Sequence, residues 1–307
     1  MPRLQVERSI KINAPIQVVY PAINDFNKWV KWSPWLIMDP DAKVTIAEDG
    51  RSYEWEGKRV GAGKMKIRQE REDEYIHFDL HFLKPWKSIS STSMHLKSID
   101  EGTEVTWTMD SSLPFFMFWM KKMMSAYIEA DYERGLDMLK SFVEQGEIHS
   151  KLEFEGSSDF IGCNWIGIKT DCSLEVVGTS MEADYGMLKA YSEENDGLVN
   201  GPFFTIYHRW DIVRQGVSYV AAMPVNSIPN DLPQNFTSGT IAKTETYKLK
   251  HVGAYKHLGN AWSTLYAMHR NKELKPRKGL MPFEVYQNDP QSTPEKDLIT
   301  EIHFPVK

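Results

Sequence analysis

One carboxylate of this chain stands out because a repeated segment carries it in only one of its two copies. Segments 202–225 and 282–306 share an apolar frame of two strand-like runs around a polar loop, and each ends on a Pro-Val pair. Aligning the two Pro-Val pairs places Glu301 opposite Val220. A structural frame needs no charge at such a position, whereas a binding or catalytic site often does. Glu301 is therefore the first candidate functional residue.

The neighbours of Glu301 predict a strand and leave two environments open. Residues 298–304 alternate in the manner of a strand, so Glu301 shares a face with Ile299 and His303. The face is either the floor of a ligand site or a solvated surface on which Glu301 pairs with Lys248 or Lys250. Burying a carboxylate without a partner charge costs several kcal/mol, at roughly the scale of a broken buried ion pair. A buried Glu301 would therefore need a cation beside it.

The bulk composition describes a globular protein with room for two domains. The chain has 307 residues, of which 41% are hydrophobic and 25% are charged, enough for about two separate cores. The formal net charge is −6, which argues against a direct nucleic-acid partner, because such proteins usually present a basic face. The 10 Trp, 13 Tyr and 14 Phe exceed what two small cores need and favour cavities with aromatic walls.

Several other features narrow the class of protein. Cys163 and Cys172 are too few for a disulfide framework or a structural zinc site. The first residues lack the apolar core of a signal peptide, and the apolar run 115–120 is too short to span a bilayer. We therefore expect a cytoplasmic protein without a membrane partner, in which 115–120 is a buried helix start.

No motif of this sequence calls for a metal or a cofactor. His77, Asp79 and His81 alternate on one strand face, but no further metal ligand is evident nearby. Segment 61–65 resembles a phosphate loop only superficially, because Met65 stands where the hydroxyl residue belongs. Nucleophile-elbow, zinc-protease and dinucleotide-binding patterns are missing as well. We expect no cofactor and no metal site.

The first half reads as a sheet that grips one long helix. An alternating run at 4–12 predicts a strand, and Asn13-Ala14-Pro15 predicts the start of a helix that ends near Asn24. Turn residues at regular intervals between 43 and 111 predict an antiparallel meander. From 115 to 145 the apolar period becomes helical, and Gly146 is a stop signal. These elements predict an α+β domain with space between sheet and helix.

Several short motifs in this half point to a known family. They are Ile12-Asn13-Ala14-Pro15, Asn24-Asp25-Phe26, Trp29-Val30-Lys31-Trp32-Ser33-Pro34-Trp35, Gly61-Ala62-Gly63, Thr106-Trp107-Thr108-Met109 and Gly135-Leu136. With these motifs, roughly 3–146 resembles the START-like (SRPBCC) superfamily, in its polyketide cyclase/dehydrase branch. The resemblance implies a helix-grip domain at 1–147 with a hydrophobic ligand tunnel. We expect this second cavity to be lined by Trp32, Trp55, Phe78 and Trp107, although plain core filling needs the same residues.

The second half contains the repeat. Polar residues at 148–158, with Gly156-Ser157-Ser158, predict a linker. Each copy then offers a strand, a helix and a hairpin, which predicts pseudo-twofold symmetry with both helices on one face of a shared sheet. The second half also contains the motif His251-Val252-Gly253-Ala254-Tyr255, Trp262 in the helix, and a closing stretch from Tyr286-Gln287-Asn288-Asp289-Pro290 to Ile302. With these motifs, the domain at 159–307 resembles the GyrI-like effector-binding domain of multidrug-responsive regulators.

The GyrI-like resemblance implies a glutamate at the floor of an aromatic cavity that meets lipophilic cations. Glu301 is our candidate for that glutamate, and Tyr255 and Trp262, two helical turns apart, are candidate walls. Simple core packing is the alternative for both aromatic residues. Tyr207 and Tyr286 hold equivalent positions in the two repeats, which we interpret as shared framework.

Three functions follow from these resemblances. The first is a binding or sequestering protein for hydrophobic and amphipathic molecules, cationic ones included. The second is a hydrolase of strained, cyclopropane-type electrophiles that uses Trp262 and Glu301. The third is a regulator that acts through a protein partner, since neither half offers a helix-turn-helix with a basic recognition helix. The sequence leaves open whether the partner is another protein or a second copy of the chain.

Overall fold

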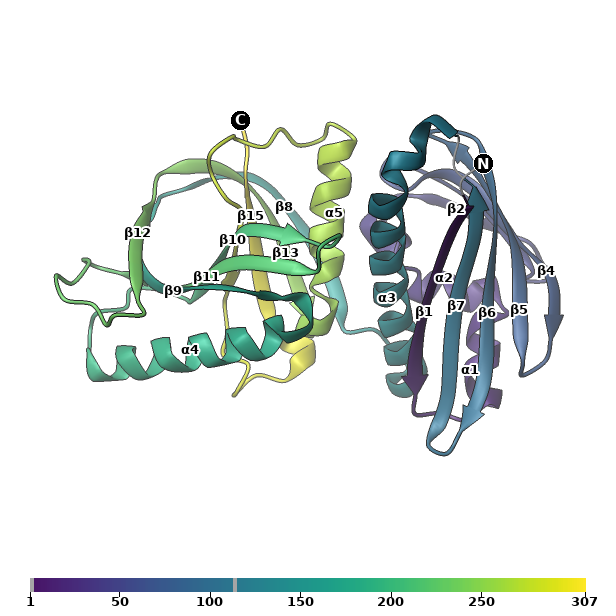
Figure 1. Cartoon of the computed structure of the whole chain (residues 1–307), viewed down its shortest axis with the longest axis horizontal. Helices are drawn as coiled ribbons and strands as arrows, with labels where there is room; N and C mark the ends of the chain where they lie inside the picture. The colour runs from purple at the N-terminus through teal and green to yellow at the C-terminus, as the bar shows by residue number, and fades with distance from the viewer. Residues whose placement is uncertain (1–2, 113–114) are drawn as a thin grey trace. The chain divides into compact units, whose positions relative to one another are not determined.

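The chain folds into two compact units, residues Met1–His149 and Ser150–Lys307. A computed structural model describes residues 3–112 and 115–307, and Figure 1 shows the helices and strands of each unit. The α+β class is confirmed for both: each unit has one antiparallel sheet with helices against it. Among the described residues, no helix has both the length and the apolar character that crossing a bilayer demands.

Unit 1 is a seven-stranded antiparallel sheet in the order β1-β7-β6-β5-β4-β3-β2. Helices α1 (Ile16–Ile23) and α2 (Phe26–Trp32) follow the first strand, and α3 (Lys121–Gln145) closes the unit after the 3₁₀ turn η2 (Phe115–Met120). Gly146 ends α3 in the left-handed conformation, as predicted, with φ 79°. The helix-grip arrangement is confirmed. The strands are β1 (Arg3–Ile12), β2 (Lys43–Ile46), β3 (Ser52–Gly57), β4 (Gly61–Arg71), β5 (Tyr75–Lys84), β6 (Ser88–Ile99) and β7 (Gly102–Ser112).

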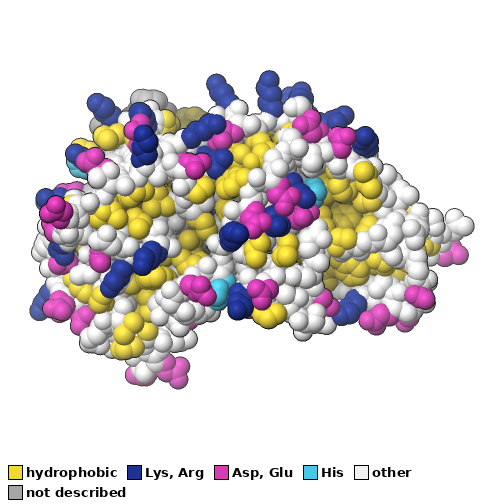
Figure 2. Space-filling model, turned by 180° about the vertical axis from the view of Figure 1, so that it is seen from behind, with side chains coloured by type: hydrophobic (Ala, Val, Ile, Leu, Met, Phe, Trp, Pro, Cys, Tyr) yellow, Lys and Arg dark blue, Asp and Glu magenta, His cyan; other side chains and the backbone are white. Residues whose placement is uncertain are grey.

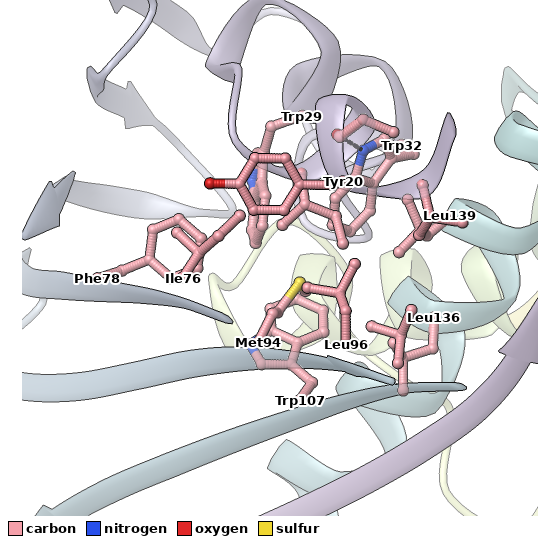
Figure 3. Close-up of a cluster of buried hydrophobic side chains, with 14 of the residues drawn as sticks. Tyr20, Trp29, Trp32, Ile76, Phe78, Met94, Leu96, Trp107, Leu136 and Leu139 are labelled. Atoms are coloured by element: carbon pink, nitrogen blue, oxygen red, sulfur yellow. Dashed lines mark hydrogen bonds between the residues drawn. The ribbon is translucent and has the colours of Figure 1, made fainter. Parts of the chain in front are cut away.

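The core of unit 1 is built from aromatic side chains of α2, β7 and α3. Figure 3 shows Trp29, Trp32 and Trp107 facing one another between helix and sheet. The ring centroids of Trp29 and Trp32 are 4.4 Å apart, and those of Trp29 and Trp107 are 5.4 Å apart. The ring of Tyr132 on α3 stacks on Trp107 at 4.0 Å. Close packing of this kind leaves no voids between helix and sheet at these positions.

Unit 2 is an eight-stranded antiparallel sheet in the order β12-β9-β11-β10-β14-β15-β13-β8. The six inner strands form two like halves, so the predicted pseudo-twofold arrangement is present. Helices α4 (Val177–Glu194) and α5 (Gly259–Arg270) pack on the same face of the sheet. The strands are β8 (Ser150–Phe160), β9 (Cys163–Ser173), β10 (Phe204–Asp211), β11 (Gly216–Val225), β12 (Thr237–Ile241), β13 (Thr244–Gly253), β14 (Phe283–Tyr286) and β15 (Ile299–Pro305).

The segment predicted as a linker is an edge strand instead. Residues 150–158 belong to β8, which pairs along its length with β13. Leu152 and Phe154 pack against the apolar cluster under α5, and Gly156 adopts φ 85° beside a bulge in the pairing. Charged residues alternate with these apolar ones on the other face, so the polar composition concealed a strand period. Ser150 therefore begins unit 2.

Candidate ligand-binding site

A buried carboxylate lies where the two halves of unit 2 meet. Glu284 on β14 is 1% exposed. It is paired in register with Thr205 on β10, and the flanking pairs are Phe204 with Val285 and Ile206 with Phe283. The pseudo-twofold axis therefore passes between Glu284 and Thr205. Alternation along the two strands directs both side chains to the face that α4 and α5 cover.

Three aromatic side chains donate hydrogen bonds to this carboxylate. Tyr207 Oη and Tyr286 Oη lie 2.9 and 2.8 Å from Glu284 Oε2, and Trp262 Nε1 on α5 donates to Oε1. A further chain of hydroxyl groups leads away from the site, because Thr205 Oγ1 lies 2.9 Å from Tyr286 Oη and 2.6 Å from Tyr185 Oη. Residues from both repeats thus hold one acid.

These donors, together with Tyr185 and Tyr255, form an aromatic cage around the carboxylate. The ring centroids of Tyr207 and Trp262 are 5.4 Å apart, edge to face. Tyr286 contacts both Tyr185 of α4 and Tyr255, each at 5.6 Å. We call the set Tyr185, Tyr207, Tyr255, Trp262 and Tyr286 the aromatic cage. Rings in such arrangements present faces that attract cations.

The charge of Glu284 is not balanced by a basic side chain. No ion pair to this carboxylate occurs within 3–112 and 115–307, the ranges that the structure describes. Burial raises the pKa of Glu284, and the three donated hydrogen bonds offset only part of that effect. Burial also raises the pKa of Tyr255 to about 12, so this hydroxyl stays protonated near neutral pH. The aromatic cage therefore surrounds one buried acid with rings and hydroxyl groups.

Comparison with protein families assigns each unit. Residues 3–144 match the family described as polyketide cyclase / dehydrase and lipid transport. Residues 163–307 match the family described as GyrI-like small molecule binding domain. The chain is a fusion of these two domains. Unit 1 is thus the cyclase-type domain and unit 2 the GyrI-like domain, as the motifs in the sequence predicted.

Comparison with solved structures finds similarity at low sequence identity. A structure of an EcmrR–DNA complex is 15% identical, with a TM-score of 0.44 over 63% of this chain and 72% of that one. SAV2435 bound to tetraphenylphosphonium is 17% identical, with a TM-score of 0.41 over 50% of this chain and 94% of that one. CV1439 from Chromobacterium violaceum is 17% identical, with a TM-score of 0.36 over 46% and 98%. No curated protein matched the chain in sequence.

Glu301 lies on the opposite face of the GyrI-like sheet from Glu284. The register pairs Val285 with Glu301 and Glu284 with Ile302, so adjacent positions place the two acids on opposite sides. Glu301 Oε1 is 3.3 Å from Lys248 Nζ, which is the surface pairing that the sequence left as its alternative. Figure 2 shows acidic and basic side chains beside an apolar hollow on this half of the chain. A ligand role for Glu301 stays a prediction.

The structure brings Trp262 and Tyr255 together, but around Glu284. Our alignment of the final Pro-Val pairs directed attention to the last strand. Aligning Tyr207 with Tyr286 instead places Glu284 opposite Thr205, which is a second asymmetric carboxylate in the same repeat. Aligning the repeat on these two tyrosines would have identified Glu284 from the sequence. The two tyrosines interpreted as framework are hydrogen-bond donors of the site.

The residues expected to line a tunnel in the cyclase-type domain are mostly core. Trp32 and Phe78 are 0% exposed and Trp107 is 1% exposed, so even a water molecule has no space against them. Trp32 donates its indole N–H to the Ala22 carbonyl oxygen, and Trp107 donates to Thr92 Oγ1, both at 2.9 Å. Only Trp55 is partly exposed. Core filling, the alternative weighed above, describes the other three in this conformation.

A buried histidine makes the stability of the GyrI-like domain depend on pH. His251 on β13 is 0% exposed, and burial lowers its pKa to about 4, with His257 adding to the effect. The unfolded chain binds a proton near the ordinary pKa of about 6.5. Since the unfolded state binds more protons between those two values, stability falls as the pH drops from about 6.5 to 4. We expect a loss of up to about 3 kcal/mol from this residue.

The measurement is urea unfolding at pH 7 and pH 5 for the wild type and for His251→Gln. The wild type should lose clearly more stability between the two pH values than the variant does. Equal losses in both proteins would contradict the assignment of this pH dependence to His251.

Proposed function

We propose that the GyrI-like domain binds lipophilic organic cations, with Glu284 as their counter-ion inside the aromatic cage. The observation that carries the proposal is a fully buried carboxylate with aromatic neighbours and no basic partner among the described residues. An unpaired buried carboxylate is unfavourable, and a bound cation relieves that cost. Cation–π contact with each ring adds roughly 0.5–2 kcal/mol where the site is desolvated.

The cage must open for a ligand to reach Glu284, because the carboxylate has almost no exposed surface. Trp262 is the ring best placed to move. It is only partly buried, and it contacts Tyr266, which is 46% exposed. Tyr207 likewise leads outward to Trp210, which is 48% exposed. A row of aromatic side chains thus connects solvent with the acid, and the phenyl rings of a lipophilic cation can exchange contacts along it.

Binding of a cation should be coupled to loss of a proton. Burial raises the pKa of Glu284, and a cation favours the ionised carboxylate, so affinity should rise with pH through that pKa and then level off. The measurement is isothermal titration calorimetry with tetraphenylphosphonium across pH 4–8, in buffers of different ionisation enthalpy. We expect proton release at low pH and none on the plateau. Neutral triphenylphosphine oxide is the matched control, and its affinity should not rise with pH.

A single outcome would contradict the proposal directly. If tetraphenylphosphonium binds no more tightly at high pH than at low pH, while triphenylphosphine oxide binds equally well, Glu284 is not the counter-ion. The biological role that fits the proposal is sequestration of such cations, since neither domain matched here is a DNA-binding family.

A hydrolase is the second candidate, because the structure joins a tryptophan and a glutamate by a hydrogen bond. Glu284 replaces Glu301 in that role, since Glu301 is on the other face of the sheet. A carboxylate whose pKa is raised by burial is suited to accept a proton from water. A cyclopropane-containing alkylator should then be consumed at substoichiometric protein. Protection that stops at one equivalent, with no hydrolysed product, would favour sequestration.

A further inference from the structure

One end of the cyclase-type domain exposes several large apolar side chains. Trp119 is 69% exposed and Phe118 59%, although 115–120 was expected to be a buried helix start. Leu83 near the end of β5 is 44% exposed, Trp86 in the turn that follows is 63% exposed, and Ile89 at the start of β6 is 72% exposed. We call these five residues the tip surface.

The sheet register places both segments at the same end of the domain. Ser91 on β6 pairs with Asp110 on β7, and Ser90 Oγ lies 2.9 Å from Ser111 Oγ. The turn before β6 therefore projects past the end of β7, which is where η2 begins. Figure 1 shows the start of α3 and the β5–β6 connection at the same end of unit 1. Exposed apolar residues that are far apart in sequence thus lie at one end of the domain.

The charged residues within the two segments of the tip surface are all basic. Segments 83–89 and 118–123 contain Lys84, Lys87, Lys121 and Lys122 and no acidic residue. All four lysines are exposed, and Lys84 Nζ pairs with Glu56 Oε1 at 2.5 Å. This local excess contrasts with the net charge of −6 for the whole chain. A surface that is apolar and cationic together is complementary to an apolar phase with an anionic boundary.

We propose that the tip surface docks the protein onto anionic phospholipid bilayers. Indole and phenyl rings insert at the level of the headgroups, where Trp is favoured, and the lysines contact lipid phosphates. Each lysine near an anionic leaflet strengthens attachment, and the attraction weakens as salt screens it. The docking is interfacial and leaves the fold intact. It would bring the protein to membranes, in which lipophilic molecules accumulate, and it requires nothing of Glu284.

The test is flotation of the full chain with vesicles of phosphatidylcholine and phosphatidylglycerol, compared with phosphatidylcholine alone. We expect the partition coefficient to be at least about tenfold higher on the anionic vesicles and to fall with salt. In the double variant Trp86→Ser/Trp119→Ser the partition coefficient on anionic vesicles should fall at least about tenfold, because two inserting indole rings are removed. In the double variant Lys121→Glu/Lys122→Glu the partition coefficient should fall by a similar factor, and it should no longer depend on salt.

Ile161→Ser is the matched control, since Ile161 is 85% exposed but belongs to the GyrI-like domain. It should bind vesicles as the wild type does. Near-ultraviolet circular dichroism verifies that each variant is folded, and brominated lipids should quench tryptophan fluorescence in the wild type more than in Trp86→Ser/Trp119→Ser. Equal binding by wild type and tip variants would overturn the proposal. So would dimers that the tip variants abolish, with no vesicle binding, because the surface would then join two copies of the chain.

Discussion

Replacing Glu284 by Gln should weaken tetraphenylphosphonium binding by about 2–4 kcal/mol, or roughly 30- to 1,000-fold in Kd. The substitution keeps the shape of the side chain and removes only its charge. The amide oxygen still accepts the Trp262 N–H, and the hydroxyl groups of Tyr207 and Tyr286 can reorient to accept from the amide N–H groups. Because burial of a charged group is relieved, the free energy of unfolding should stay the same or rise. Calorimetric titration at pH 7.5 measures the Kd.

The matched control for this variant is Glu301→Gln, which removes a carboxylate from the other face of the same sheet. Lys248 keeps a partner there, since its Nζ is also 2.7 Å from Glu155 Oε2. We expect wild-type affinity in Glu301→Gln. If Glu301→Gln loses the cation and Glu284→Gln keeps it, the prediction from the sequence is right and the proposed site is wrong. Wild-type affinity in both variants would mean that neither of these two carboxylates pairs with the ligand.

Truncating Trp107 to Ala should destabilise the cyclase-type domain by about 3–5 kcal/mol. The ring is surrounded on every side, by Trp29, Trp32 and Tyr132 among others. Helix α3 packs closely against this ring at Gly135, because a Cβ added there would lie 2.8 Å from the Trp107 ring. Its loss leaves a cavity and strips a hydrogen bond from Thr92. Calorimetry of the full chain should show one transition lowered by roughly 10 °C.

Trp86→Ala is the control, since it deletes the same side chain at a position that is 63% exposed. Exposed substitutions of this kind usually change stability by less than about 0.5 kcal/mol. Comparison of Trp107→Ala with Trp86→Ala also decides whether Trp107 is a core residue or lines a ligand tunnel. A Trp107→Ala protein of unchanged stability that had lost a hydrophobic ligand would show that Trp107 lines a ligand tunnel.

Much of the architecture was predictable because it follows from the local periodicity of apolar and polar residues. Alternation along 4–12 and the meander to 111 specify strands, and the helical stripe ending at Gly146 specifies α3. The repeat in the second half predicted two like halves with helices on one face, and motif resemblance named both domains. The segment 148–158, which was predicted to be a linker, shows where prediction from local composition fails. Lys151, Glu153 and Glu155 on one face of β8 predicted a solvated segment, while Leu152 and Phe154 pack on the other face.

The site illustrates the same limit at the scale of single residues. The sequence by itself determined that one copy of the repeat carries a carboxylate that the other copy lacks, and the resemblance made Tyr255 and Trp262 candidate neighbours of one. Only the tertiary structure decided which carboxylate, because the choice depends on the pairing of β10 with β14 and of β14 with β15. A shift of one residue along a strand moves a side chain to the opposite face. Alternation therefore shows which residues share a face, while the packing of α4 and α5 decides which face encloses Glu284 and which leaves Glu301 among lysines.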